Sequence, residues 1–289
     1  MMQPLEGITL DHGDTLMART SYLSIAYEIE GEGIPLVFIH SVATDHRLWY
    51  YQQAYFHTRY RTITIDILGH GSVMWPPGDR PLEQTARHVQ QLLQQLGIGP
   101  AFVIGLCAGA AVAMLIALEA PTLLRGLVLV NPWSTPNAHL RSLGERLFRL
   151  AESKNMVAYI DLFQRYAFPA GAMGYYRTEI ERLQTLVLAQ DPRAVAYAWA
   201  ACLAVNLGER LTEIATPSLI IAGSYDLFTL PYLARTVAER LCEAELEVWE
   251  ETGHFPCLED PERFNARLEV FIRRCLARRE IAAGPEGAG

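Results

Sequence analysis

Short runs of apolar residues alternate with amphipathic stretches along most of the chain. The runs IPLVFIHS, ending at His40, YRTITIDILGHG, ending near Asp66, AFVIGL and LRGLVLVNP have the continuous apolar character of buried strands. Between them, DHRLWYYQQAYFHT and PLEQTARHVQQLLQQLGI have helical spacing, with Gly97 placed to end the second helix. After AFVIGL, the stretch AGAAVAMLIALEAP predicts a buried helix. Apolar strands that alternate with helices predict a parallel sheet covered by helices on both faces.

The pattern differs at both ends of this region. LMARTSYLSIAYEIEG predicts a hairpin or meander of two strands, whereas residues 133–214 contain several helical segments and no convincing strand. TPSLIIAGSYD and AELEVWEETGH then restore the strands, and PERFNARLEVFIRRCLAR closes with a helix. We therefore expect one α/β core formed by residues 1–132 and 215–275, a helical cap formed by 133–214, and a disordered tail at 276–289 that ends in GPEGAG.

Composition and charge narrow the class of protein. The 289 residues, 51% of them hydrophobic, can bury a large core, and the formal charge of −8 argues against a nucleic-acid partner. The N-terminal MMQPLEGITLDHGD lacks the apolar centre of a signal peptide. Residues 100–118 are nearly uncharged, but Gly105 and Gly109 at their centre favour a strand, a turn and a helix over a membrane span. Five cysteines without regular spacing predict a cytoplasmic protein with reduced thiols.

The stretch GLCAG is the strongest chemical signal in the sequence. It places Cys107 between Gly105 and Gly109, where a strand turns into a helix. Such a turn is so tight that the neighbours of a nucleophile must be small. The N-terminus of the following helix favours negative charge on the nucleophile and on an oxyanion beside it. Packing of an ordinary buried cysteine is the alternative interpretation of the same residue.

With FIHS, DILGHG, GLCAG, AGSYD and ETGHF in this order, the chain resembles capped α/β-hydrolases over about residues 15–275. The resemblance implies an α/β-hydrolase fold and a Cys-His-Asp triad made of Cys107, Asp226 and His254. Asp226 would hold the imidazole in one tautomer, and His254 would take the thiol proton. The resemblance also implies an oxyanion hole formed by the backbone N–H groups of Val42 and Ala108.

Two positions depart from the family pattern. Most members have serine where Cys107 stands, and glycine where this chain has Ser41, so the donor on the loop after His40 is left open. We expect His40 to order this loop, and we expect turn-stabilising roles for Asp66 and His70. Surface or packing roles are expected for the other histidines and cysteines: His12, His46, His57, His88, His139, Cys202, Cys242, Cys257 and Cys275. No metal-ligand spacing or phosphate-binding glycine loop is present in the sequence, so neither a metal nor a cofactor is predicted.

The predicted function is hydrolysis of an ester, lactone or thioester through a covalent acyl-cysteine intermediate. Cysteine at the elbow occurs in dienelactone hydrolases, polyhydroxyalkanoate synthases and some thioesterase domains, which this chain resembles at the elbow only. The apolar segments MVAYIDLFQRYAFPAGAMGYY and AVAYAWAACLAVNL favour a hydrophobic acyl substrate, either free or carried on coenzyme A or a carrier protein. An acyltransferase or cyclase of a biosynthetic pathway is one alternative. A binding protein without turnover is another, and the complete order of the three residues argues against it.

Overall fold

The sheet of this protein runs through the whole core. A computed structural model describes the backbone of residues 8–10, 16–19, 24–73, 81–169, 171 and 174–283. The remaining residues, which include most of the segment judged not to be a signal peptide, His12 and the GPEGAG tail, lie outside this description. Within the described ranges, nine strands form one sheet in the order β1-β2-β3-β5-β4-β6-β7-β8-β9. The strands are β1 (Ile8–Leu10), β2 (Leu16–Arg19), β3 (Ser24–Glu30), β4 (Pro35–Ile39), β5 (Arg61–Ile65), β6 (Ala101–Leu106), β7 (Leu124–Val130), β8 (Ser218–Gly223) and β9 (Ala244–Trp249).

Strand direction follows the sequence pattern. The six strands from β5 to β9 in the sheet order are parallel, whereas β1, β2 and β3 pair antiparallel. Strands β2 and β3 are the two strands predicted from LMARTSYLSIAYEIEG. All residues of β4, β6 and β8 are buried, which is why these strands appear as continuous apolar runs. Because the register pairs Ile39 with Gly105 and Val130 with Ile221, the carboxyl ends of the central strands meet along one edge.

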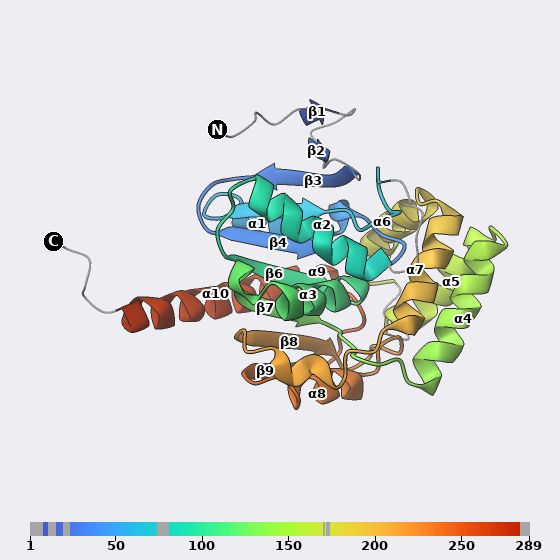
Figure 1. Cartoon of the computed structure of the whole chain (residues 1–289). Helices are drawn as coiled ribbons and strands as arrows, with labels where there is room; N and C mark the ends of the chain where they lie inside the picture. The colour runs from blue at the N-terminus through green and yellow to red at the C-terminus, as the bar shows by residue number, and fades with distance from the viewer. Residues whose placement is uncertain are drawn as a thin grey trace.

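Helices cover both faces of the sheet. Figure 1 shows α2, α3 and α8 in front of it and α10 passing behind it, and α1 packs against α10. This arrangement confirms the prediction of an α/β-hydrolase fold with a mostly parallel sheet. The helices of the core are α1 (Tyr50–Phe56), α2 (Pro81–Gln95), α3 (Ala108–Glu119), α8 (Pro231–Ala238), α9 (Pro256–Glu259) and α10 (Pro261–Ala283), with 3₁₀ turns η1 (His46–Trp49), η2 (Pro121–Leu123) and η3 (Arg210–Glu213).

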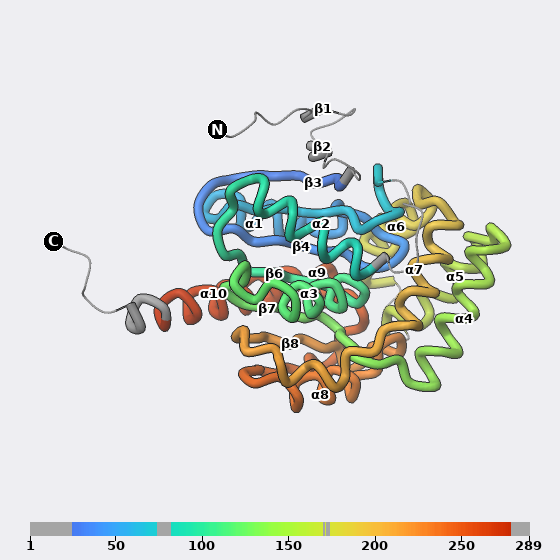
Figure 2. Tube along the Cα trace, in the orientation of Figure 1, coloured from blue at the N-terminus to red at the C-terminus, as the bar shows by residue number. Residues whose placement is uncertain are grey.

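Four further helices form the helical insert, which we define as residues 138–204. They are α4 (Ala138–Glu152), α5 (Met156–Ala167), α6 (Arg177–Leu188) and α7 (Pro192–Ala204). The chain leaves the sheet after β7, passes through the helical insert and returns at β8, the strand that pairs with β7 (Figure 2). In Figure 1 the insert lies beyond the carboxyl ends of the parallel strands.

The structure differs from the sequence prediction in four elements. The sequence indicated neither β1 nor the short helices α8 and α9. Helix α10 continues to Ala283, so residues 276–283 are helical where a disordered tail was predicted to begin. The reason is that LARREIAA contains good helix formers and no glycine or proline before Gly284.

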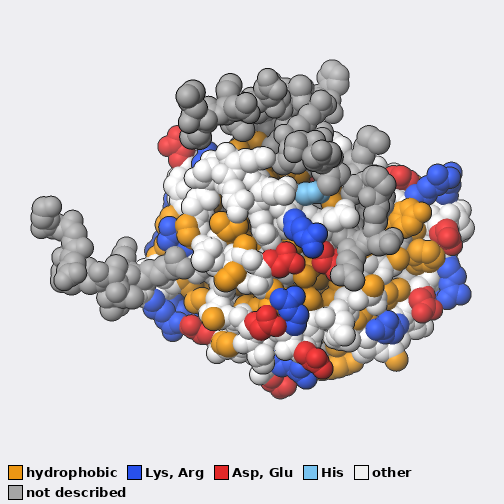
Figure 3. Space-filling model, viewed as in Figure 1, with side chains coloured by type: hydrophobic (Ala, Val, Ile, Leu, Met, Phe, Trp, Pro, Cys, Tyr) orange, Lys and Arg blue, Asp and Glu red, His pale blue; other side chains and the backbone are white. Residues whose placement is uncertain are grey.

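The last strand and the surface carry paired charges. Strand β9 ends the order of the sheet, and Arg267 of α10 forms ion pairs with Glu245 and Glu247 of this strand. Acidic and basic side chains are interspersed over the face shown in Figure 3. Among the described helices, none is long and apolar enough to cross a membrane.

Candidate active site

Cys107 lies on a strained turn between β6 and α3. Its backbone has φ 53° and ψ −109°, a region that costs a non-glycine residue about 1–3 kcal/mol. The Cys107 N–H donates to the carbonyl of Val130 at 2.9 Å, which anchors the turn to the neighbouring strand. A Cβ at Gly105 would overlap the backbone of Gly109, and a Cβ at Gly109 would overlap the carbonyl of Ile39. The two glycines are therefore required by the close approach of three backbone segments.

His254 and Asp226 come from the loops that follow β9 and β8. Nδ1 of His254 lies 2.8 Å from Oδ2 of Asp226, and both side chains are fully buried. The carboxylate is held by the N–H groups of Phe228 at 2.7 Å and Thr229 at 3.1 Å, and by the Thr229 hydroxyl at 2.7 Å. An ionised carboxylate only accepts hydrogen bonds, so Nδ1 carries the proton that His254 donates to Asp226.

The other ring nitrogen of His254 is available for chemistry. Nε2 is buried and has no hydrogen-bond partner among the described residues. Burial lowers the pKa of His254, but the Asp226 carboxylate and the neighbouring Cys107 side chain outweigh burial and raise the pKa to about 10. The structure thus brings together the three residues selected from the sequence.

Two buried polar residues that the sequence did not single out hold the loop of His254. Oε2 of Glu259 accepts the N–H of Gly253 at 2.7 Å, and Oε1 accepts the N–H of Phe255 at 2.8 Å. This carboxylate therefore binds the backbone on both sides of His254. Asn131, at the end of β7, donates to the carbonyl of His254 at 2.9 Å. Glu259 lies two residues before Pro261, where the predicted last helix begins, and no local pattern reveals this contact. Asn131 carries no local signal.

Glu259→Gln is expected to lower kcat about tenfold with little change in KM. The amide nitrogen would face a backbone N–H and break one of the two hydrogen bonds beside His254. Burial raises the pKa of Glu259 to about 7, so the wild-type enzyme should lose the same bond, and activity, as pH falls below about 7. The pH profile of kcat for both proteins checks this. If kcat of the variant still falls below about pH 7 as in the wild type, that fall is caused by a group other than Glu259.

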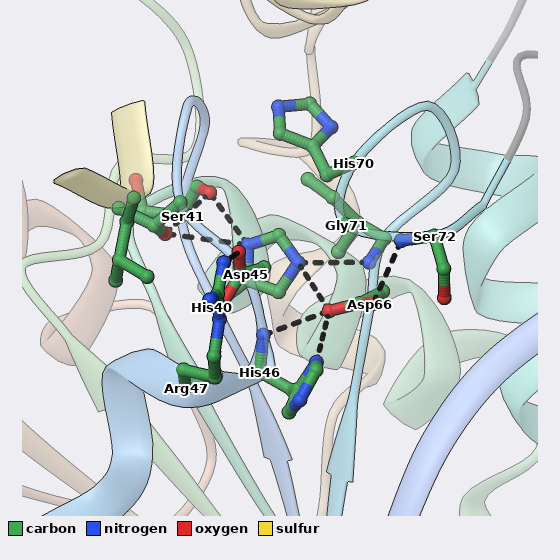
Figure 4. Close-up of polar contacts among 12 residues, drawn as sticks. His40, Ser41, Asp45, His46, Arg47, Asp66, His70, Gly71 and Ser72 are labelled. Atoms are coloured by element: carbon green, nitrogen blue, oxygen red, sulfur yellow. Dashed lines mark hydrogen bonds and ion pairs between the residues drawn. The ribbon is translucent and has the colours of Figure 1, made fainter. Parts of the chain in front are cut away.

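The loop after β4 is built around buried histidines (Figure 4). His40 Nε2 accepts the N–H of Ile67 at 2.9 Å, and its Nδ1 lies 2.7 Å from the carbonyl of Ser41. His70 Nε2 accepts the N–H of Ala43 at 3.0 Å, and Ala43 has φ 62°. This geometry agrees with the ordering role expected for His40 and gives His70 a specific function in the same loop.

The two expected oxyanion donors, Val42 and Ala108, are both buried. Val42 is buried within the loop, and among the described residues its N–H has no hydrogen-bond acceptor. Ala108 is the first residue of α3, and the first N–H groups of a helix have no acceptor inside it. The larger Ser41, which stands before Val42, is accommodated at 2% exposure with its carbonyl bonded to Thr44.

His46 and Asp66 form a pair that the sequence did not predict. Oδ1 of Asp66 accepts the backbone N–H of His46 at 2.7 Å and lies 2.8 Å from its Nδ1 (Figure 4). Burial lowers the pKa of His46, but the Asp66 carboxylate outweighs burial and raises it. Ligand atoms of Asp45, His46 and Asp66 lie within 4.8 Å of one another. Hydrogen bonds from Arg47 to Asp45 and from His46 to Asp66 account for this cluster as loop structure, so it supplies no case for a metal site.

Known proteins that are similar to this chain in sequence or structure include several hydrolases. The model of a family described as "Alpha/beta hydrolase family" matches residues 36–267. The "Putative carbamate hydrolase RutD" of Caulobacter segnis is 28% identical over 86% of this chain and 96% of its own. The 3-oxoadipate enol-lactonase 2 of Acinetobacter baylyi is 24% identical over 90% and 97%. The crystal structure of a hydrolase from Pseudomonas aeruginosa PA01 aligns with a TM-score of 0.83 and 26% identity, over 91% of this chain and 99% of that one.

Proposed function

Because the chain belongs to the alpha/beta hydrolase family, we propose that it is a hydrolase that uses Cys107 to cleave an ester, lactone or thioester. The observation that carries the proposal is the buried hydrogen bond between Asp226 and Nδ1 of His254, which leaves Nε2 free beside Cys107. A cysteine kept only for packing would not need the strained turn that presents it.

The proposed reaction has two steps. Sγ of Cys107 attacks the carbonyl carbon, the bond to the leaving oxygen or sulfur breaks, and Nε2 of His254 gives its proton to the leaving group. The N–H groups of Val42 and Ala108 hold the oxyanion of the tetrahedral intermediate. Water then attacks the acyl-cysteine and gives a proton to Nε2 of His254. The bond between the acyl carbon and Sγ breaks, the carboxylic acid leaves, and Cys107 returns as the thiolate beside the protonated imidazole. No cofactor takes part in either step.

The helical insert is proposed to act as the cap of this site. Its inner side presents the buried ring of Trp199, which is tilted against the ring of Phe228 with 5.4 Å between ring centroids, and the Phe228 ring lies 5.1 Å from that of His254. These contacts support a hydrophobic acyl group, free or carried on coenzyme A or a carrier protein. The names of the relatives are consistent with attack on a carbonyl carbon, because carbamates and enol-lactones are both cleaved there.

Intact mass after incubation with acyl thioesters and p-nitrophenyl esters tests the proposal. We expect an acyl adduct on Cys107 and release of the free acid, with longer acyl chains preferred to acetyl. An acyltransferase or cyclase is the second candidate, because a thioester intermediate reacts well with amines and alcohols. An acyltransferase would transfer the acyl group to an added amine or alcohol in preference to water. No adduct and no turnover with any donor would contradict both candidates.

Cys107 should alkylate before the other cysteines at pH 6.5. An ordinary thiol is then only about 1% thiolate, whereas Cys107 lies beside a protonated imidazole. Burial raises the pKa of Cys202, Cys257 and Cys275, and Cys242 is exposed and serves as the reference thiol. Iodoacetamide labelling followed by peptide mapping measures the order. Labelling of Cys242 ahead of Cys107 would contradict the proposed ion pair.

A further inference from the structure

Gln190 links the helical insert to the core by hydrogen bonds. It lies in the turn between α6 and α7 and is buried. Its Nε2 donates to Oδ2 of Asp45 at 3.1 Å and to the carbonyl of Leu186 at 2.9 Å, and its Oε1 accepts the N–H of Gly71 at 2.8 Å. Because a backbone N–H only donates and an ionised carboxylate only accepts, these partners fix the orientation of the amide.

Both core partners of Gln190 belong to the loops that shape the proposed oxyanion hole. Asp45 lies two residues after Ala43 and caps η1 by accepting the N–H of Arg47 at 3.1 Å. Gly71 directly follows His70, whose Nε2 accepts the N–H of Ala43 at 3.0 Å. The two loops face each other in Figure 4, with Asp45 on one and Gly71 on the other. Gln190 therefore holds the loop of Val42 at its end and, through His70, at its middle.

The His70 part of this linkage persists over the working range of pH. Burial lowers the pKa of His70 to about 3, so the ring stays neutral and Nε2 remains an acceptor. Its Nδ1 lies 3.3 Å from the carbonyl of Leu68, which suits the tautomer that Ala43 requires. The left-handed backbone of Ala43, at φ 62°, is then held by a bond that the loop cannot supply alone.

We propose that Gln190 is a positioning residue, which sets the oxyanion loop when the helical insert is seated on the core. The inference rests on the proposed function, because it assigns to the Val42 N–H the task of binding the oxyanion. Its consequence is that the acylation step depends on a residue of the insert that does not contact the nucleophile. A loop shift weakens a donor without removing it, so the effect should fall short of the 10²–10³-fold loss that follows removal of a donor.

The test compares Gln190→Leu with Gln184→Leu on p-nitrophenyl acetate, whose acyl group is too small to need the pocket. Gln184 is the matched control, because its Nε2 donates to Oε1 of Gln164 at 3.0 Å within the insert. We expect kcat to fall about tenfold in Gln190→Leu and to stay unchanged in Gln184→Leu. Alkylation of Cys107 by iodoacetamide, which forms no oxyanion, should not slow in either variant. Unchanged kcat, or equal loss of acylation and alkylation, would overturn the proposal.

Hydrogen exchange separates failure of this inference from failure of the proposed function. In Gln190→Leu the amides of Gly71 and Ala43 should both exchange faster, whereas Gln184→Leu leaves both protected. A wild-type protein that hydrolyses nothing would refute the proposed function, and the exchange of Ala43 would still decide whether Gln190 holds the loop. If Gln190→Leu does not fold, Gln190→Glu places a carboxylate against Asp45, and its kcat defect should shrink as pH falls. A pH-independent defect would overturn the linkage.

Discussion

A Cys107→Ala variant is expected to fold and to lose ester and thioester hydrolysis by about 10⁴-fold or more. The substitution removes only Sγ from a side chain that is 2% exposed, and alanine keeps the small volume that the turn demands. His254 and Asp226 remain bonded to each other, so the loss measures the missing nucleophile. Steady-state hydrolysis and thermal unfolding check the two halves of the expectation.

Cys202→Ala is the matched control for this experiment. Cys202 is also buried at 2% exposure, and it lies in α7 of the helical insert. Its loss should leave turnover within about threefold of wild type, because its thiol has no imidazole partner among the described residues. Full activity in Cys107→Ala would place the nucleophile elsewhere and contradict the proposed reaction.

Cys107→Ser separates the hydrolase from the acyltransferase. Serine fits the turn and keeps a proton for His254 to take, so a simple esterase should retain measurable hydrolysis. An enzyme that transfers its acyl group to an amine or alcohol relies on the reactivity of the thioester. The serine variant of such an enzyme should accumulate a stable acyl ester that is visible by mass.

Asp226→Asn is expected to lower kcat by 10²–10⁴-fold, with unfolding little affected. Oδ1 accepts the N–H groups of Phe228 and Thr229, so the amide oxygen must stay there, and the amide nitrogen then faces Nδ1 of His254. Nδ1 would have to accept, which moves the ring proton to Nε2 and removes the base. The loss should be smaller than in a serine enzyme, because a thiolate already formed needs its base less.

Activity and alkylation together decide the outcome for Asp226. The carboxylate helps to raise the pKa of His254, so alkylation of Cys107 at pH 6.5 should also slow in Asp226→Asn. Asp161→Asn is the control, because Asp161 is an exposed partner of Arg165 on α5 and its loss should change neither rate. Full activity of Asp226→Asn would move the acid role to another carboxylate, and Asp66 would be tested next.

The sequence predicts those parts of the site that are local. A glycine-flanked elbow, and an acid and a histidine after successive strands, are short patterns tied to strand ends, so the resemblance to α/β-hydrolases could assign Cys107, Asp226 and His254 without a structure. The supporting contacts depend on pairs far apart in the chain. Gln190 meets Gly71 and Asp45 only because the helical insert folds back over the sheet, and no spacing reveals this.

The sequence likewise predicts those elements of the fold that have a clear local pattern. Long buried strands and helices have a clear period, and they were predicted with the correct type and order. Helix α8 is short and begins at Pro231, and β1 has three residues, so neither contains enough turns or alternations to show a period. The extent of α10 was missed because the apolar pattern ends before the helix does, and helix propensity alone continues it to Ala283.

The charges on β9 bear on how this protein behaves when it is concentrated. An edge strand presents unpaired backbone groups that can recruit a strand from another molecule, which is a common route to aggregation. Glu245 and Glu247 place two carboxylates on this strand. Arg267 of α10 forms ion pairs with both of them. A second copy docking edge to edge would have to bring like charges together and displace those pairs. The acidic side chains of β9 therefore disfavour pairing of this edge strand with a strand of another molecule.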